Sequence, residues 1–79
     1  MLTLNEKKVL RVLLTLFGES YSINQIAKKC AITPNGTLKI LRKFEKEGLL
    51  QSKKIANILS YFLDFNNEKT KNILELALN

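Results

Sequence analysis

The side chains with the clearest chemical potential are the basic residues between positions 22 and 54. This stretch carries eight lysines and arginines against two acids, a net charge of +6. The remaining residues include five bases and five acids, so the whole net charge of the protein is concentrated in one stretch. Such an imbalance on so short a chain is typical of a surface that binds a polyanion. The eight bases are Lys28, Lys29, Lys39, Arg42, Lys43, Lys46, Lys53 and Lys54.

The residue types used in catalysis and metal binding are scarce. The chain has no histidine and one cysteine, which excludes an internal disulfide and argues against a zinc site. It also lacks a glycine-rich phosphate loop, a nucleophile elbow and a suggestive pair of carboxylates. We therefore expect no enzyme, no cofactor and no metal. Cys30 is expected to be a small buried hydrophobe, although the neighbouring lysines would suit a redox sensor if the thiol were exposed.

Length and hydropathy limit the class of protein further. The 79 residues predict one domain, residues 1–79, and both a complete protein and a module of a longer chain fit the sequence. The apolar N-terminal segment is interrupted by Lys7, Lys8 and Arg11, so it does not match a signal peptide. No run of about eighteen apolar residues occurs, which excludes a membrane-spanning segment. A lone thiol and no signal suggest a reducing, cytoplasmic location.

The elements that must position the basic residues begin with a helix over residues 4–17. Thr3 and Glu6 form a capping box at its start, and Gly18 supplies a C-terminal stop. Helical spacing places on its core-facing side Val9, Leu10, Leu13, Leu16 and Phe17.

A second helix is predicted over residues 23–30. Ser22 and Gln25 form another capping box, and Tyr21 before them can pack on Ile26 as a hydrophobic staple. Its buried side is expected to hold Ile23, Ile26, Ala27 and Cys30, whereas Lys28 and Lys29 point away.

A third helix is predicted over residues 34–47. Thr33 can cap it, Pro34 fits its first position because no N–H is needed there, and Gly48 ends it. Its core positions are Thr37, Leu41 and Phe44. The outward side then carries Asn35, Gly36, Lys39, Arg42, Lys43 and Lys46.

The hydrophobic period changes after Gly48. Residues 50–54 and 58–64 are predicted to form two strands around the connection 55–57. In the second strand one face carries Leu59, Tyr61 and Leu63, followed by Phe65. Asn66 or Asn67 then caps a last helix over residues 67–78.

This order of elements resembles a known class of DNA-binding domain. Two short helices joined by a three-residue turn form a helix-turn-helix, and a hairpin follows at once. The order helix-helix-helix-strand-strand-helix resembles the winged helix-turn-helix domains of small archaeal, bacterial or viral transcription regulators. The segment Phe44-Glu45-Lys46-Glu47-Gly48-Leu49-Leu50 is similar to their Leu-acid-x-x-Gly-Leu-apolar ending. The resemblance, from about Leu4 to Phe65, implies a mainly α fold with a small β-hairpin, of the α+β class.

If the third helix enters the DNA major groove, its outward side meets the bases. Asn35 can pair bidentately with adenine, and Lys39 or Arg42 can reach guanine or a phosphate. Gly36 has no side chain, so the backbone there can approach the groove closely. The other bases would contact flanking phosphates. The predicted DNA-binding set is Lys28, Lys29, Thr33, Asn35, Gly36, Lys39, Arg42, Lys43, Lys46, Lys53 and Lys54.

The sequence departs from the family pattern at three places. Ala31 stands where the turn usually has glycine, and a left-handed backbone there costs alanine about 1–2 kcal/mol. Thr37 takes a core position that is usually apolar, so its hydroxyl needs a helix carbonyl. Residues 55–57, at the tip of the hairpin, lack the Arg and Gly that suit minor-groove insertion, so we do not expect the tip to read bases.

Surplus apolar residues near both ends of the chain predict a homodimer. The expected interface consists of Val12, Leu14, Ile73, Leu74, Leu76, Ala77 and Leu78. Two-fold pairing would place two third helices at half-sites about 34 Å apart. The alternative is that the last helix only covers its own domain.

The sequence thus predicts a dimeric transcription regulator that binds double-stranded DNA sequence-specifically, a repressor by occlusion of a promoter, with no small-molecule ligand evident. Three alternatives stay open. A winged helix can serve protein–protein contact, which Leu38 and Ile40 would support. The charge also suits RNA or non-specific nucleic-acid binding, although Asn35 favours specificity. The third alternative is that the basic residues only form a solvated helix face, as Glu45 and Glu47 on the same segment would suggest.

Overall fold

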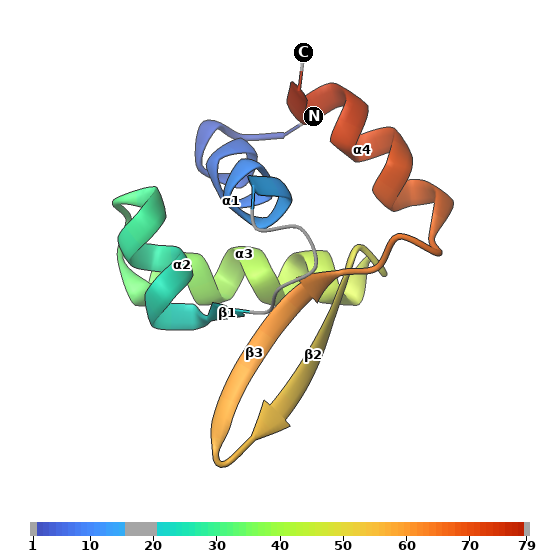
Figure 1. Cartoon of the computed structure of the whole chain (residues 1–79). Helices are drawn as coiled ribbons and strands as arrows, with labels where there is room; N and C mark the ends of the chain where they lie inside the picture. The colour runs from blue at the N-terminus through green and yellow to red at the C-terminus, as the bar shows by residue number, and fades with distance from the viewer. Residues whose placement is uncertain (1, 16–20, 79) are drawn as a thin grey trace.

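Four helices and a three-stranded antiparallel sheet make up the part of the chain that the computed structural model describes, residues 2–15 and 21–78. The elements in chain order are α1 (Leu4–Thr15), β1 (Tyr21–Ser22), α2 (Ile23–Cys30), α3 (Pro34–Lys46), β2 (Leu50–Ile55), β3 (Ile58–Leu63) and α4 (Glu68–Leu78) (Figure 1). The predicted α+β class is confirmed. The predicted end of the first helix at residue 17, its core residues Leu16 and Phe17, and Gly18 lie outside the described residues.

Both predicted capping boxes are present. The Glu6 N–H donates to Thr3 Oγ1 at 3.1 Å, and the Thr3 N–H donates to Glu6 Oε1 at 2.8 Å. At the start of α2, Ser22 and Gln25 exchange the same two bonds. Each pair satisfies two N–H groups that a helix start leaves without partners, so these helices begin where the sequence places them.

The end of α3 and the start of α4 are joined by one asparagine. Helix α3 ends at Lys46, one residue earlier than predicted, with Glu47 as its cap and Gly48 at φ 84°. Asn67 Nδ2 donates to the Gly48 carbonyl at 3.0 Å, and Asn67 Oδ1 accepts from the Lys69 N–H at 2.8 Å. Of the two asparagines considered from the sequence, Asn67 therefore caps α4, which begins at Glu68.

The β2–β3 hairpin differs slightly from the prediction. Ile55 pairs with Ile58 and belongs to β2, so the connection is a two-residue turn of Ala56 and Asn57. Both turn residues have positive φ, 50° and 69°, which matches the right-handed twist of the flanking strands. Strand β3 ends at Leu63, one residue earlier than predicted, because Asp64 turns the chain by accepting the Asn66 N–H at 3.1 Å.

A third strand was not predicted from the sequence. Tyr21 and Ser22 form β1 and pair with Tyr61 and Ser60 of β3, which makes β3 the central strand of the order β1-β3-β2. This pairing fastens the segment before α2 to the root of the hairpin.

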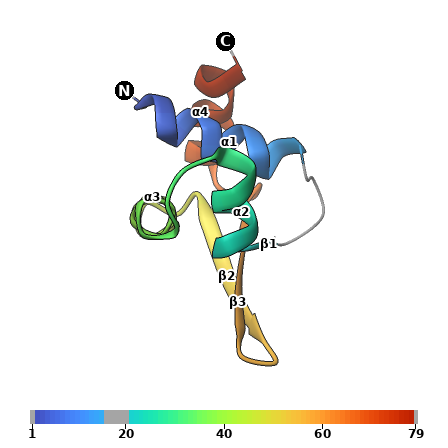
Figure 2. The ribbon, with the colours of Figure 1, turned by 90° about the vertical axis from the view of Figure 1, so that its left-hand side faces the viewer.

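The core lies where α1, α2 and α3 meet the root of the sheet. Its buried residues are Val9, Leu10, Leu13, Ile26, Cys30, Leu41, Phe44, Leu49, Leu50, Tyr61 and Leu63. The far half of the hairpin extends away from this core, and α4 lies beside α1 at the opposite end of the molecule (Figures 1 and 2). The tip of the hairpin, residues 55–59, is therefore exposed to solvent.

Candidate nucleic-acid interface

The start of α3 is fixed by hydrogen bonds within its first turn. Thr33 Oγ1 accepts the Gly36 N–H at 3.1 Å, and Thr37 Oγ1 donates to the Thr33 carbonyl at 2.9 Å. The second bond is the carbonyl partner that a buried threonine requires, and Thr37 is fully buried. A Cβ on Gly36 would lie 3.0 Å from Thr33 Oγ1, so glycine also keeps this cap undisturbed.

The turn between α2 and α3 adopts the strained backbone expected from the sequence. Ala31 has φ 57° and ψ 40°, in the left-handed region. Its N–H donates to the Lys28 carbonyl at 3.3 Å, and the Ile32 N–H donates to the Ala27 carbonyl at 3.2 Å. These bonds close the end of α2 and set the direction in which α3 departs.

One exposed stripe runs the length of α3. Thr37, Leu41 and Phe44 are all 0% exposed and face the core. On the other side the spacing of four, three and four residues places side by side Asn35, Lys39, Arg42 and Lys46, all exposed. Three cations and one amide therefore form a continuous row, which we call the basic stripe, with the amide nearest the start of the helix.

Lys43 is held at the edge of this stripe by α1. Its Nζ lies 2.7 Å from Oε2 of Glu6, a residue only 4% exposed. Burial alone would raise the pKa of Glu6, but hydrogen bonds from Lys43 and Thr3 and the charge of Lys43 lower it below its ordinary value of 4.5. The bond to Glu6 in turn raises the pKa of Lys43. No local pattern in the sequence indicates this ion pair, whose residues lie 37 positions apart, and the predicted contact of Lys43 with DNA stays a prediction.

The two acids of the basic stretch lie off the stripe. Glu45 accepts a hydrogen bond from Ser52 Oγ of β2, so its carboxylate points to the hairpin. Glu47 lies at the C-terminal cap, beyond the last turn. Because neither acid sits within the row, the stripe keeps its positive charge, unlike a mixed solvated helix face.

The remaining predicted bases surround α3. Lys28 and Lys29 are exposed in the last turn of α2. Lys53 and Lys54 are exposed in β2, opposite Ser60 and Leu59 respectively. Since successive strand residues point to opposite faces, the pleat separates these two lysines although they are adjacent in the sequence. Lys54 shares the face of Ser52, which contacts α3.

The residues expected at a dimer interface are described only in part. Val12 and Leu14 are half-buried and pack against the core of their own chain. The side chains of the other five, Ile73, Leu74, Leu76, Ala77 and Leu78, lie outside the described residues. The proximity of α1 and α4 places the two candidate segments at the same end of the fold (Figure 2).

Cys30 behaves as the sequence predicts. It is 5% exposed in the core, and burial raises the pKa of its thiol. The interpretation as a small buried hydrophobe is therefore confirmed. Over residues 2–15 and 21–78, no three potential metal ligands come together. In the same part of the chain no helix combines the length and hydrophobicity that crossing a membrane requires.

Comparisons with known proteins identify the fold. No protein-family model and no curated protein matches the sequence. Among solved structures, BpsR of Bordetella bronchiseptica matches 98% of the chain with a TM-score of 0.80 and 16% identity. A mutant of MepR from Staphylococcus aureus, bound to an oligodeoxyribonucleotide, matches 98% with a TM-score of 0.79 and 19% identity. ZitR of Lactococcus lactis, a zinc-responsive MarR family member, matches 95% with a TM-score of 0.73 and 23% identity.

The chain has a winged-helix fold. Its helix-turn-helix is α2 and α3, and its wing is β2, β3 and the turn between them. The fold predicted from the sequence is therefore confirmed. The chain spans 54% of the BpsR chain, 58% of the MepR chain and 50% of the ZitR chain, so these solved structures contain additional segments.

Proposed function

We propose that this protein binds double-stranded DNA through α3 and regulates transcription, acting as a sequence-specific dimeric repressor. The observation that carries the proposal is the basic stripe, which faces away from the core along the whole of α3. An α-helix fits the width of the major groove, and a row of cations and one amide matches its phosphate walls and base edges. Related support comes from the similar fold of MepR, whose mutant was solved with an oligodeoxyribonucleotide, and of AntR, an antimony-specific transcriptional repressor.

The side chains divide between base reading and positioning. Asn35, in the first turn, can pair bidentately with adenine, and Lys39 or Arg42 can reach guanine. Lys46 and the cations of α2 and the wing would bind phosphates, which gives affinity and register without sequence information. Thr33 and Gly36 would act indirectly, because the Gly36 N–H donates to the Thr33 hydroxyl and this bond fixes the first turn of α3.

The two alternative uses of the fold are less well supported. A protein-binding α3 needs an apolar outward face, but Leu38 and Ile40 are half-buried and the outward positions are basic or polar. Non-specific nucleic-acid binding needs only charge, and it would leave Asn35 at the start of the stripe without a role. Sequence-specific binding of double-stranded DNA would use both the positive charge of the stripe and the amide of Asn35.

Dimerisation would set the geometry of the DNA site. A two-fold pairing through α1 and α4 would put two copies of α3 about one helical turn of DNA apart, near 34 Å. Sedimentation of the protein at micromolar concentration is expected to give about twice the 9.0 kDa of one chain. A species with the mass of one chain would remove the dimer from the proposal.

Salt titration tests the DNA binding itself. We expect the logarithm of the affinity for duplex DNA to fall linearly with the logarithm of salt concentration, by about 0.9 for each phosphate neutralised. Selection of bound fragments from a random pool would supply the preferred duplex. An affinity that does not depend on salt, or a selection that enriches no sequence, would contradict specific DNA binding.

A further inference from the structure

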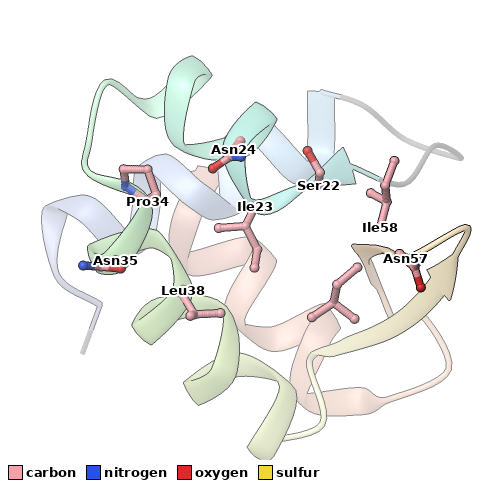
Figure 3. Close-up of a pocket in the computed structure, with 9 residues that line it drawn as sticks. Ser22, Ile23, Asn24, Pro34, Asn35, Leu38, Asn57 and Ile58 are labelled. Carbon is pink, nitrogen blue, oxygen red and sulfur yellow. The ribbon is translucent and has the colours of Figure 1, made fainter.

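A notch of about 330 Å³ lies between the first turn of α2, the first half of α3 and the tip of the wing. Ile23 and Leu38 line its helical side, and Asn57 and Ile58 line the side of the wing (Figure 3). Leu59 also contributes to the lining. Of the lining residues, Asn35 belongs to the DNA-binding set predicted from the sequence, and the others do not.

The notch is uncharged but has cations on both sides. All of its lining residues are neutral, and most of the lining surface is apolar. Arg42 is exposed on α3 one helical turn after Leu38, so its side chain lies next to the helical side of the notch. Lys54 pairs with Leu59 across the two strands of the wing. A neutral, apolar recess thus separates two positive charges.

The apolar side chains on the wing side remain open to solvent. Ile58 is 56% exposed and Leu59 is 36% exposed. Burying such side chains against a partner is favourable, because apolar surface leaves water. The partner must offer a carbon-rich, uncharged part to the recess and negative charge to Arg42 and Lys54.

We propose that the notch seats a deoxyribose of the DNA strand that passes between α3 and the wing. This inference rests on the proposed DNA binding. The sugar is the uncharged, carbon-rich part of the backbone, and the phosphates that flank it carry the charge that Arg42 and Lys54 would neutralise. A phosphate in the notch itself would lose water without gaining a cation, so the sugar is the part that fits.

A sugar bound in the notch would give the wing a positioning role and not a base-reading one. With a sugar held between Leu38 and Ile58, the spacing between α3 and the wing fixes the position of the strand relative to the helix. Asn35 lies at the other edge of the notch, so the same contact would set the register in which this amide meets the bases.

Hydroxyl-radical footprinting tests this placement directly, because the radical attacks deoxyribose hydrogens and reports the exposure of each sugar. The probe is the duplex that the wild-type protein selects from a random pool. We expect strong protection of one or two adjacent sugars in each half-site, in addition to the broader footprint. In Ile58→Ala and Leu38→Ala, cleavage at those sugars should rise at least threefold, with affinity about fivefold lower.

Ile55→Ala is the matched control. Ile55 is 58% exposed and pairs with Ile58 across the wing, but it does not line the notch. It should leave the cleavage pattern unchanged. Protection that survives both notch variants, or that Ile55→Ala relieves equally, would overturn the proposal and leave the notch to another occupant, such as a small apolar molecule. Absence of any footprint would instead contradict the proposed DNA binding.

Discussion

Helix α3 and the wing both carry exposed basic residues, but they arrange this charge in different ways. On α3 the spacing of Asn35, Lys39, Arg42 and Lys46 follows the helical repeat, so these side chains form one row. In the wing, Lys53 and Lys54 are neighbours in a strand, so the pleat directs them to opposite faces. A helix can therefore present several groups to one groove, whereas a two-stranded wing presents few to each side.

The two regions also differ in how firmly their ends are held. The first turn of α3 is fixed by Thr33 and Thr37, and its inner side is fully buried. The wing ends in a two-residue turn beyond the core, next to two isoleucines that are more than half exposed. We infer that α3 supplies sequence recognition and that the wing supplies position and affinity.

Paired charge removals should separate these two contributions. Lys39→Ala combined with Arg42→Ala should lower affinity for the selected duplex about 100-fold, because a contact with guanine contributes about 1–3 kcal/mol and the lost phosphate contact adds to it. Discrimination against an unrelated duplex should fall with it. Lys53→Ala combined with Lys54→Ala should weaken both duplexes alike, about tenfold, since phosphate contacts carry no sequence information. Fluorescence anisotropy with both duplexes measures the four affinities.

The control for charge alone lies on α4. Lys69→Ala combined with Lys71→Ala removes the same charge from exposed positions outside the basic stretch. This variant should stay within about twofold of the wild type. Equal losses from all three pairs would show that net charge matters and that its location does not, which would remove the distinction between α3 and the wing.

Glu6→Gln should show whether the ion pair with Glu6 keeps Lys43 from contacting DNA. Glutamine at this position still completes the capping box with Thr3, but it has no charge to hold Lys43. If Lys43 then reaches a phosphate, the dependence of log affinity on log salt should steepen by up to about 0.9. Adding Lys43→Met should return the slope to the wild-type value. An unchanged slope in Glu6→Gln would mean that Lys43 never gains a phosphate.

The same pair predicts a pH dependence of stability. Burial raises the pKa of Glu6, but hydrogen bonds from Lys43 and Thr3 and the charge of Lys43 together outweigh it, so the pKa in the folded protein lies below its ordinary value of 4.5. The ionised carboxylate therefore stabilises the fold above pH 4.5, and this contribution is lost as the pH falls through the lower, folded-state pKa. Urea unfolding should show a steeper loss of stability in acid for the wild type than for Glu6→Gln.

Local signals in the sequence account for most of the fold. The capping boxes at Thr3 and Ser22 and the cap at Thr33 involve residues three positions apart, so their spacing alone places the helix starts. The inward positions of α3 follow from one helical period. The exposed row on its other side follows as soon as the inward side is known, and the structure places Asn35, Lys39 and Arg42 on it.

Contacts between distant residues account for what the sequence did not predict. Strand β1 has two residues, too few for any alternating pattern, and it exists only because Tyr21 meets Tyr61 in the folded chain. The ion pair of Glu6 and Lys43 joins residues 37 positions apart. The notch draws on three separate elements, so no spacing along the chain could indicate it.

The smallest expected change in stability comes from two alanines with strained backbone, Ala31 before α3 and Ala56 in the turn at the tip of the wing. Ala31 and Ala56 have φ of 57° and 50°, and this left-handed backbone costs alanine about 1–2 kcal/mol relative to its usual conformation. Glycine relieves the strain but gains freedom in the unfolded chain, which returns about 0.4–1 kcal/mol. Ala31→Gly and Ala56→Gly should therefore each raise the free energy of unfolding by about 0.5 kcal/mol, measured by urea denaturation. Ala31→Gly should leave DNA affinity unchanged, because the hydrogen bonds of Ala31 and Ile32 already fix the turn. A gain at Ala56 with a loss at Ala31 would show that the alanine methyl group at Ala31 helps to hold α3 in its direction.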